Sequence, residues 1–144
     1  MPEPVETRAD YLHWLRIPTR WMDNDVYGHV NNVTYYSYFD TVVNEHLVAN
    51  GVLDPATSPV FGVVAETTCR FVEPLTFPEV VDAGLAVTKL GNSSVGYEIG
   101  LFREGQDSPV AVGTFVHVYV DRKSRRPRDV PEAVRDLLAP LFRG

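Results

Sequence analysis

The sequence predicts an α+β domain in which an antiparallel sheet of five strands wraps around one long helix. Three observations favour this fold class. One run with large apolar residues at helical spacing occupies about residues 32–49, a short strand-like segment precedes it, and four alternating segments follow it. No repeat or low-complexity run interrupts this order, so we predict a single domain over residues 1–144.

The long helix is predicted to begin at about Asn32 and end near residue 49. Gly28 permits a sharp turn before it, and Asn31 or Asn32 can cap its first turn. Asn50-Gly51 is a typical stop. Large apolar residues surround much of its first half, which indicates a helix buried on several sides; they are Tyr35, Tyr36, Tyr38, Phe39, Val42 and Val43.

The strands are predicted from two-residue alternation and from the turn residues between them. After a loose polar lead-in over residues 1–10, we expect strands at about 13–20, 60–72, 79–90, 95–104 and 110–120, and a short final helix within 129–141. Alternation along 60–72 places Val63, Ala65 and Thr67 on one face and Val64 and Glu66 on the other. Glu66 and Arg70 share a face, and we predict that they pair.

Composition excludes several classes of function. The net charge of −6 argues against general affinity for nucleic acid or anionic membranes. No apolar run approaches the roughly 20 residues that a membrane span needs, and the N-terminus lacks the pattern of a signal peptide. One cysteine, Cys69, excludes an internal disulfide and fits a reducing compartment. We therefore expect a cytoplasmic protein.

A dense polar motif lies directly ahead of the predicted helix, within residues 23–32. A helix N-terminus presents free N–H groups and the positive end of the helix dipole, which suit an oxyanion or a polarised carbonyl. Asp25 lies just upstream, where its carboxylate can face the same atom. These features predict an acyl-transfer site.

The run Asp23-Asn24-Asp25-Val26-Tyr27-Gly28-His29-Val30-Asn31-Asn32, followed by Tyr35, resembles the signature of the 4-hydroxybenzoyl-CoA thioesterase family of hotdog-fold acyl-CoA thioesterases. The resemblance covers about residues 15–131 and is nearest to the long-chain acyl-CoA thioesterase branch. It implies a hotdog fold, hydrolysis of an acyl-CoA or acyl-carrier-protein thioester, and a site built between the subunits of a homodimer or homotetramer.

The resemblance also implies roles for the motif residues. Asp25 is expected to be catalytic, as nucleophile or as general base, and the backbone N–H groups of Asn31 and Asn32 to bind the oxyanion. In the similar plant-type acyl-carrier-protein thioesterases an Asn stands where this chain has Tyr27, so a catalytic role for His29 is secondary. The residues expected to shape the loop or contact substrate are Asp23, Gly28, His29 and Tyr35, with Asp23 paired to Arg20.

Two further features bear on ligands. Residues 122–128 carry five basic side chains, and either form a solvated turn or meet the phosphates of coenzyme A through Arg122, Lys123, Arg125 and Arg126. His13, His46 and His117 are scattered without metal-ligand spacing, so we predict no metal, and no motif indicates a cofactor.

Two other functions stay open at this point. A hotdog domain can bind acyl-CoA without hydrolysing it, as a sensor or carrier. A hotdog hydratase or dehydratase would act on an enoyl or 3-hydroxyacyl thioester, and would need an Asp and a His placed as acid–base partners.

Overall fold

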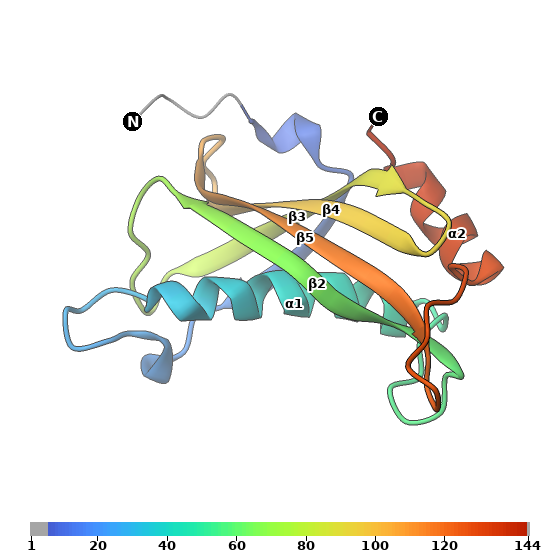
Figure 1. Cartoon of the computed structure of the whole chain (residues 1–144). Helices are drawn as coiled ribbons and strands as arrows, with labels where there is room; N and C mark the ends of the chain where they lie inside the picture. The colour runs from blue at the N-terminus through green and yellow to red at the C-terminus, as the bar shows by residue number, and fades with distance from the viewer. Residues whose placement is uncertain (1–5, 144) are drawn as a thin grey trace.

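The computed structural model describes residues 6–143 and contains one sheet and one long helix (Figure 1). Its main elements are β1 (His13–Pro18), α1 (Asn32–Ala49), β2 (Val60–Phe71), β3 (Val80–Leu90), β4 (Ser94–Arg103), β5 (Pro109–Asp121) and α2 (Glu132–Leu138). Short 3-10 helices cover Arg8–Asp10, Trp21–Asp23 and Ala139–Leu141. The predicted fold class is confirmed, and the bounds of α1 are those that the sequence predicts.

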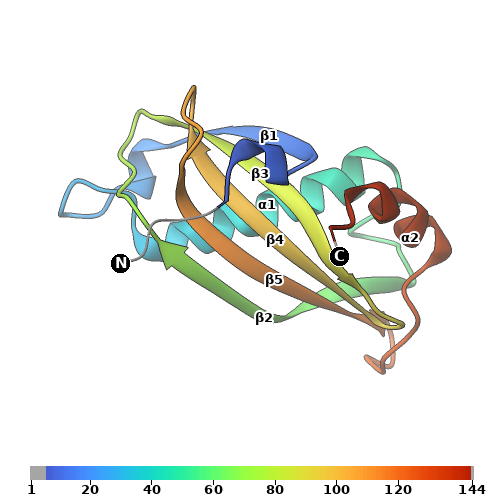
Figure 2. The same ribbon diagram turned by 90° about the horizontal axis from the view of Figure 1, so that it is seen from above.

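The five strands are antiparallel and lie in the order β1-β3-β4-β5-β2. The sheet curves around α1, which crosses its concave face (Figures 1 and 2). This is the hotdog arrangement that the motif implies. The two edges of the sheet are β1 and β2, and β2 is twelve residues long.

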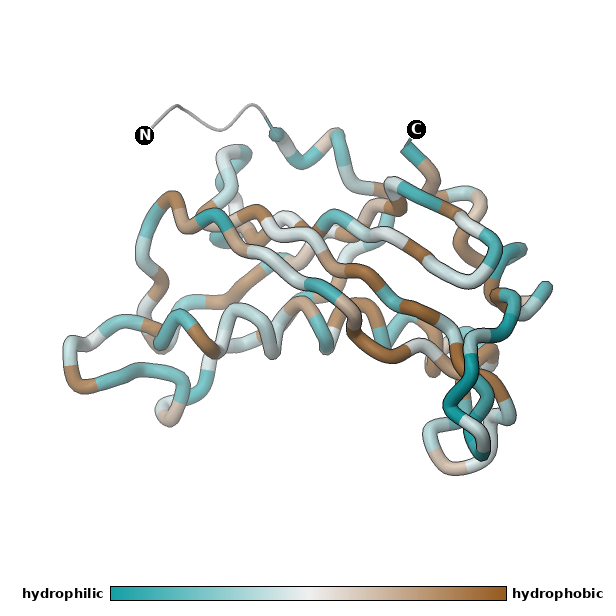
Figure 3. Tube along the Cα trace, in the orientation of Figure 1, coloured by the Kyte–Doolittle hydropathy of each residue, from teal (hydrophilic) through white to brown (hydrophobic). Residues whose placement is uncertain are grey.

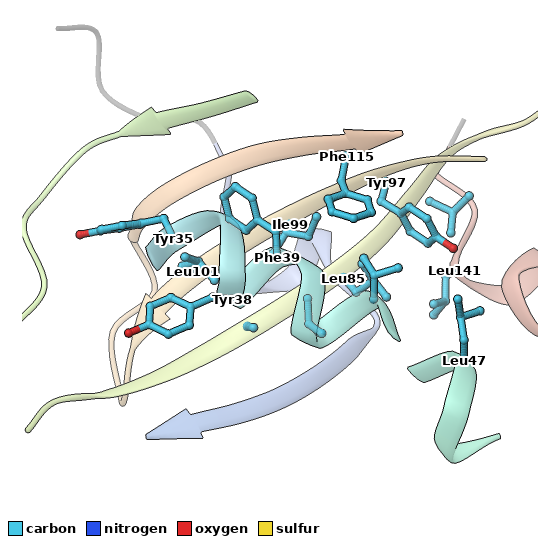
Figure 4. Packing of buried hydrophobic residues seen from close by; sticks show 14 of the residues in the cluster. Tyr35, Tyr38, Phe39, Leu47, Leu85, Tyr97, Ile99, Leu101, Phe115 and Leu141 are labelled. Atoms are coloured by element: carbon cyan, nitrogen blue, oxygen red, sulfur yellow. The ribbon is translucent and has the colours of Figure 1, made fainter. Parts of the chain in front are cut away.

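The core lies between α1 and the sheet, and Figure 4 shows aromatic and aliphatic side chains filling this space. Phe39, Val42 and Val43 are fully buried on one face of the helix, whereas Val33 and Ser37 on the opposite face are exposed. The prediction of a helix buried on several sides is therefore wrong, because the sheet covers one side of α1 only. Gly113 on β5 permits the close approach of the helix, because a Cβ there would lie 2.2 Å from the Phe39 ring. Sheet and helix therefore fix each other's position.

The prediction of a loose lead-in over residues 1–10 is partly wrong. Residues 1–5 lie outside the described residues, but Arg8–Asp10 forms a 3-10 helix that is held against the sheet. The Arg8 guanidinium donates to Gln106 O and Arg103 O and pairs with Asp82 at 3.0 Å. Polarity suggested a free segment, whereas the arginine is used to attach it to the turn after β4.

A β-bulge in β2 corrects the predicted faces of that strand. Val64 lies opposite His117, and Glu66 lies opposite Val116, so Ala65 is the extra residue. Val64 consequently points to the same side as Thr67, which is opposite Phe115. The predicted pair of Glu66 and Arg70 is also wrong, because Arg70 pairs with Glu6 at 2.7 Å.

The C-terminal α2 closes one end of the core through Val134 and Leu138, both buried. Within residues 6–143, no helix combines the length and the apolar character that crossing a membrane would require.

Candidate active site

The motif folds into a tight loop in front of α1. Asn24 and Val30 form an isolated antiparallel bridge, the Asp25 N–H donates to His29 O at 2.9 Å, and the Gly28 N–H donates to Asp25 O at 3.1 Å. Gly28 has φ +84°, in the left-handed region that favours glycine. The loop therefore returns sharply and places Asp25 close to the start of the helix.

Asp23 is buried beneath this loop and organises it. Its Oδ1 accepts from Arg20 Nε and Nη2 at 3.1 and 3.0 Å, and its Oδ2 accepts from the Arg20 N–H and the Tyr38 hydroxyl, both at 2.8 Å. Burial alone would raise the pKa of Asp23, but these hydrogen bonds outweigh it and hold the pKa below its ordinary value. The Asp23 carboxylate is thus a charged anchor, paired with Arg20 as the sequence predicts.

A second anchor comes from residues 75–77, between β2 and β3. The Val30 N–H donates to Leu75 O at 2.8 Å, and the Phe77 N–H donates to Asn24 Oδ1 at 3.0 Å. Sequence reasoning missed this segment, because its contacts join residues about fifty positions apart. The loop is therefore fixed from both sides.

Tyr35 acts on the same anchor from within the core. It is buried, its hydroxyl accepts from the Leu75 N–H at 3.2 Å, and its ring meets Phe71 edge-on at 5.0 Å between ring centroids. Of the two roles expected for Tyr35, these contacts favour shaping the loop over contacting substrate.

The Asp25 carboxylate is half-buried, and only one of its two oxygens accepts a hydrogen bond. Its Oδ1 accepts from the Tyr27 N–H at 2.9 Å, whereas its Oδ2 has no hydrogen-bond partner within residues 6–143. It faces an open hollow of about 740 Å³, whose other lining residues are Trp21, Met22, Asn24, Val26, Tyr27, Gly28 and Asn31. One oxygen thus orients the carboxylate, and the other is available to react.

At the start of α1, the N–H groups of the two expected oxyanion donors, Asn31 and Asn32, differ in their hydrogen bonding. Asn31 is the N-cap, with its Oδ1 accepting from the Val33 N–H at 3.0 Å, and its own N–H donates to Asp23 O at 2.9 Å. The Asn32 N–H, by contrast, has no partner in the described part of the chain. Asn32 therefore keeps a free backbone donor, and Asn31 does not.

The remaining histidines do not complete a site with Asp25. His29 is exposed, and its imidazole makes no hydrogen bond to any of the described residues. His13 and His46 lie against each other on β1 and α1, with 4.1 Å between ring centroids. Among residues 6–143, no three His, Cys, Asp or Glu side chains are grouped as metal ligands would be.

Residues 19–138 match the sequence pattern of the Thioesterase-like superfamily. The chain belongs to this superfamily. It is 51% identical to the PA5185 protein of Pseudomonas aeruginosa strain PAO1, with a TM-score of 0.94 over 96% of this chain and 97% of that one. It is 29% identical to PA2801 of the same species, a candidate thioesterase, with a TM-score of 0.80 over 88% and 97%. BH1999, a gentisyl-coenzyme A thioesterase, is 22% identical, with a TM-score of 0.76 over 88% and 99%, and supports the fold alone.

In this thioesterase-like chain the basic run forms a turn after β5. Asp121 Oδ2 accepts from the N–H groups of Lys123 and Ser124 at 3.0 and 2.9 Å. Arg122 bonds through Nε to Ser58 O at 2.6 Å and through Nη2 to Pro55 O, so it clamps the neighbouring loop. Lys123, Arg125, Arg126 and Arg128 are exposed, and Arg128 is paired with Asp121 at 2.9 Å.

The thioesterase-like fold separates this turn from Asp25. The turn lies beside the loop that follows α1, whereas the Asp25 loop precedes α1, and Figure 3 shows the turn as a hydrophilic segment at that end. The 18 residues of α1 span about 27 Å at 1.5 Å per residue. A single chain therefore does not bring the four basic residues to Asp25.

Proposed function

We propose that this protein hydrolyses acyl-CoA thioesters to the free acid and CoA, as a member of the 4-hydroxybenzoyl-CoA thioesterase family close to its long-chain acyl-CoA branch. Membership of the Thioesterase-like superfamily supports thioester hydrolysis in general. The observation that carries the proposal is the free Oδ2 of Asp25 beside a helix start whose Asn32 N–H is also free.

The proposed chemistry uses these two groups. The thioester oxygen accepts from the Asn32 N–H, and the positive end of the α1 dipole stabilises the negative charge that develops on it. Asp25 then either attacks the carbonyl carbon, which forms a mixed anhydride and releases the CoA thiolate before water hydrolyses the anhydride, or removes a proton from the attacking water. Both routes give the same products.

The active unit is proposed to be a homodimer that pairs along β2; two such dimers could assemble into a tetramer. The outer edge of β2 is a long row of backbone groups with no strand beside it in the described chain, and such edges are commonly paired or covered. Trp21, Met22, Val26 and Tyr27 are also exposed around the hollow. A second copy could cover both surfaces.

Antiparallel pairing of two β2 strands also supports a role for the basic turn. β2 and α1 run in opposite directions, so Phe71 lies near the start of α1 and Val60 near its end (Figure 1). A two-fold axis across β2 would place the Asp25 loop of one copy beside the basic turn of the other. Lys123, Arg125 and Arg126 could then bind CoA phosphates.

The test is release of free thiol: CoA thiol from acetyl-, octanoyl-, palmitoyl- and benzoyl-CoA, and the carrier protein's thiol from an acyl-carrier-protein thioester. The proposal expects catalytic release well above the rate in buffer with at least one CoA ester. Tight binding of acyl-CoA without thiol release would overturn it in favour of a binding protein. Loss of the double bond of an enoyl-CoA without thiol release would identify a hydratase.

A further inference from the structure

A cavity of about 450 Å³ lies at the C-terminal half of α1, away from the Asp25 loop of the same chain. It is bounded by α1, the start of β2, residues 52–55 and the end of β5. Its volume is within the range of small-molecule pockets, which are mainly apolar with a few polar groups. The apolar walls include Leu47, Val48, Val52, Leu53, Val60 and Val134.

His117 on β5 is a buried polar side chain in the wall of this cavity, with 3% of its surface exposed. Its Nδ1 is buried without a hydrogen-bond partner, and no hydrogen bond of its other ring nitrogen occurs within residues 6–143. Leaving such a group unpaired costs about 1–3 kcal/mol. Buried polar groups in native proteins are nearly always paired with protein, water or ligand. Nδ1 is enclosed beside Gly62, so Nε2 is the ring nitrogen that a ligand atom would reach.

The surroundings of His117 keep it uncharged. Its aromatic neighbours are Phe115 at 4.9 Å, Tyr97 at 5.9 Å and Tyr119 at 6.2 Å between ring centroids. Burial lowers the pKa of His117 to about 4. A neutral imidazole offers one donor and one acceptor nitrogen, which suits a hydroxyl or carbonyl group.

The His117 ring occupies space that is open only because residue 62 on β2 is a glycine. A Cβ at this position would come within 2.8 Å of His117 Nδ1 and 2.7 Å of its Cγ. Gly62 also lines the cavity, and so does the acidic Asp40 on α1. A neutral polar atom is therefore a better occupant than a carboxylate.

We propose that this cavity receives the distal end of the acyl group and that His117 hydrogen-bonds to a hydroxyl or carbonyl oxygen there. The inference rests on the proposed function, because β2 pairing would place the cavity of one copy near Asp25 of the other. It names the substrate class as acyl thioesters with a neutral polar group remote from the thioester. His117 is then a specificity-determining residue.

Calorimetric titration of the full-length protein with decanoic acid and with 10-hydroxydecanoic acid tests the inference without any turnover. Wild type is expected to bind the hydroxy acid about tenfold more tightly, which corresponds to about 1.4 kcal/mol and to one hydrogen bond. His117→Phe should abolish this preference by weakening only the hydroxy acid. His117→Gln, which keeps a hydrogen-bonding group, should retain part of the preference.

A variant at the rim of the cavity distinguishes binding in the cavity from the hydrogen bond of His117. Val48 is partly exposed at this rim, so its replacement does not change the core. Val48→Trp should fill the cavity and lower the affinity for both acids at least tenfold. Thermal melting of each variant checks that it is folded. Equal affinity of wild type for the two acids, or an unchanged preference in folded His117→Phe, would overturn the inference.

These outcomes are distinct from those of the proposed function. Thiol release without any preference for the hydroxy acid would refute the role of His117 and leave the hydrolysis intact. A clear preference without thiol release would refute the hydrolysis and leave the cavity as a binding site.

Discussion

The Tyr38 hydroxyl donates a 2.8 Å hydrogen bond to Asp23 Oδ2, and both side chains are buried. Tyr38 lies two turns into α1, and Asp23 lies just before the loop that carries Asp25. This contact links the packing of the helix to the position of the motif loop. Stability and activity are therefore expected to depend on the same pair.

Asp23→Asn should lower the free energy of unfolding by about 3 kcal/mol, because it removes a buried charge that Arg20 and Tyr38 both contact. Tyr38→Phe should cost about 1 kcal/mol, the usual contribution of one hydrogen bond. Urea denaturation of both variants and of the double variant measures the coupling between them. Additive effects of the two single changes would contradict the link.

The contribution of Asp23 to the free energy of unfolding should depend on pH. The folded-state pKa of Asp23 is lowered, so its contribution is present above the unfolded-state pKa and is lost as the pH falls through the folded-state value. The stability difference between wild type and Asp23→Asn should therefore shrink towards low pH. A difference that grows on acidification would contradict this sign.

Gly28→Ala should reduce activity by strain in the Asp25 loop. Gly28 has φ +84°, and nothing lies within 4 Å of a Cβ added there, so the cost of about 1–2 kcal/mol comes from the backbone alone. Gly51→Ala is a matched control, because Gly51 has φ +74° and equally open surroundings after α1. Urea denaturation should show similar losses of stability, with a loss of kcat only for Gly28→Ala. Equal kcat values in the two variants would refute a role for loop geometry.

Val64→Lys should shift the protein towards monomer. Val64 is half-exposed on the edge strand β2, and a lysine at an edge opposes strand pairing. Thr88→Lys is the control, because Thr88 is exposed on the internal strand β3. Sedimentation equilibrium should give a dimer for wild type and Thr88→Lys and a lower mass for Val64→Lys. A monomeric wild type would refute the proposed β2 interface.

His117 should make the fold sensitive to acid. Burial lowers its pKa from 6.5 to about 4, so below about pH 6.5 the unfolded chain binds a proton that the folded chain excludes. This linkage removes stability on the order of 3 kcal/mol by pH 4. His117→Phe should therefore lose less stability than wild type when denatured at pH 7, 5.5 and 4.5. Parallel pH profiles for the two proteins would show that His117 is not the group responsible.

Local patterns account for the parts of the fold that the sequence predicts well. The bounds of α1 follow from a cap at Asn31, an apolar repeat and a stop after residue 49, all of which are neighbours in sequence. The motif loop was predictable for the same reason. The bulge at Ala65 was not, because one extra residue in a strand leaves no trace in the alternation itself.

Long-range contacts account for what the sequence could not predict. The anchoring of the loop by residues 75–77 depends on where β2 ends in space, and the bond from the Asn31 N–H to Asp23 O depends on how the loop closes. The cavity at His117 is formed by residues from 40 to 134. A histidine in an apolar strand was its only visible sign.

The catalytic role of Asp25 is tested by kcat for thiol release by Asp25→Asn, compared with Asp54→Asn. Asp54 makes the same kind of turn, with its Oδ1 accepting from the Ala56 N–H at 2.9 Å, but lies after α1. We expect at least about a hundredfold loss of kcat for Asp25→Asn, the scale of a lost reacting carboxylate, and wild-type activity for Asp54→Asn. Wild-type kcat in a folded Asp25→Asn protein would contradict this role.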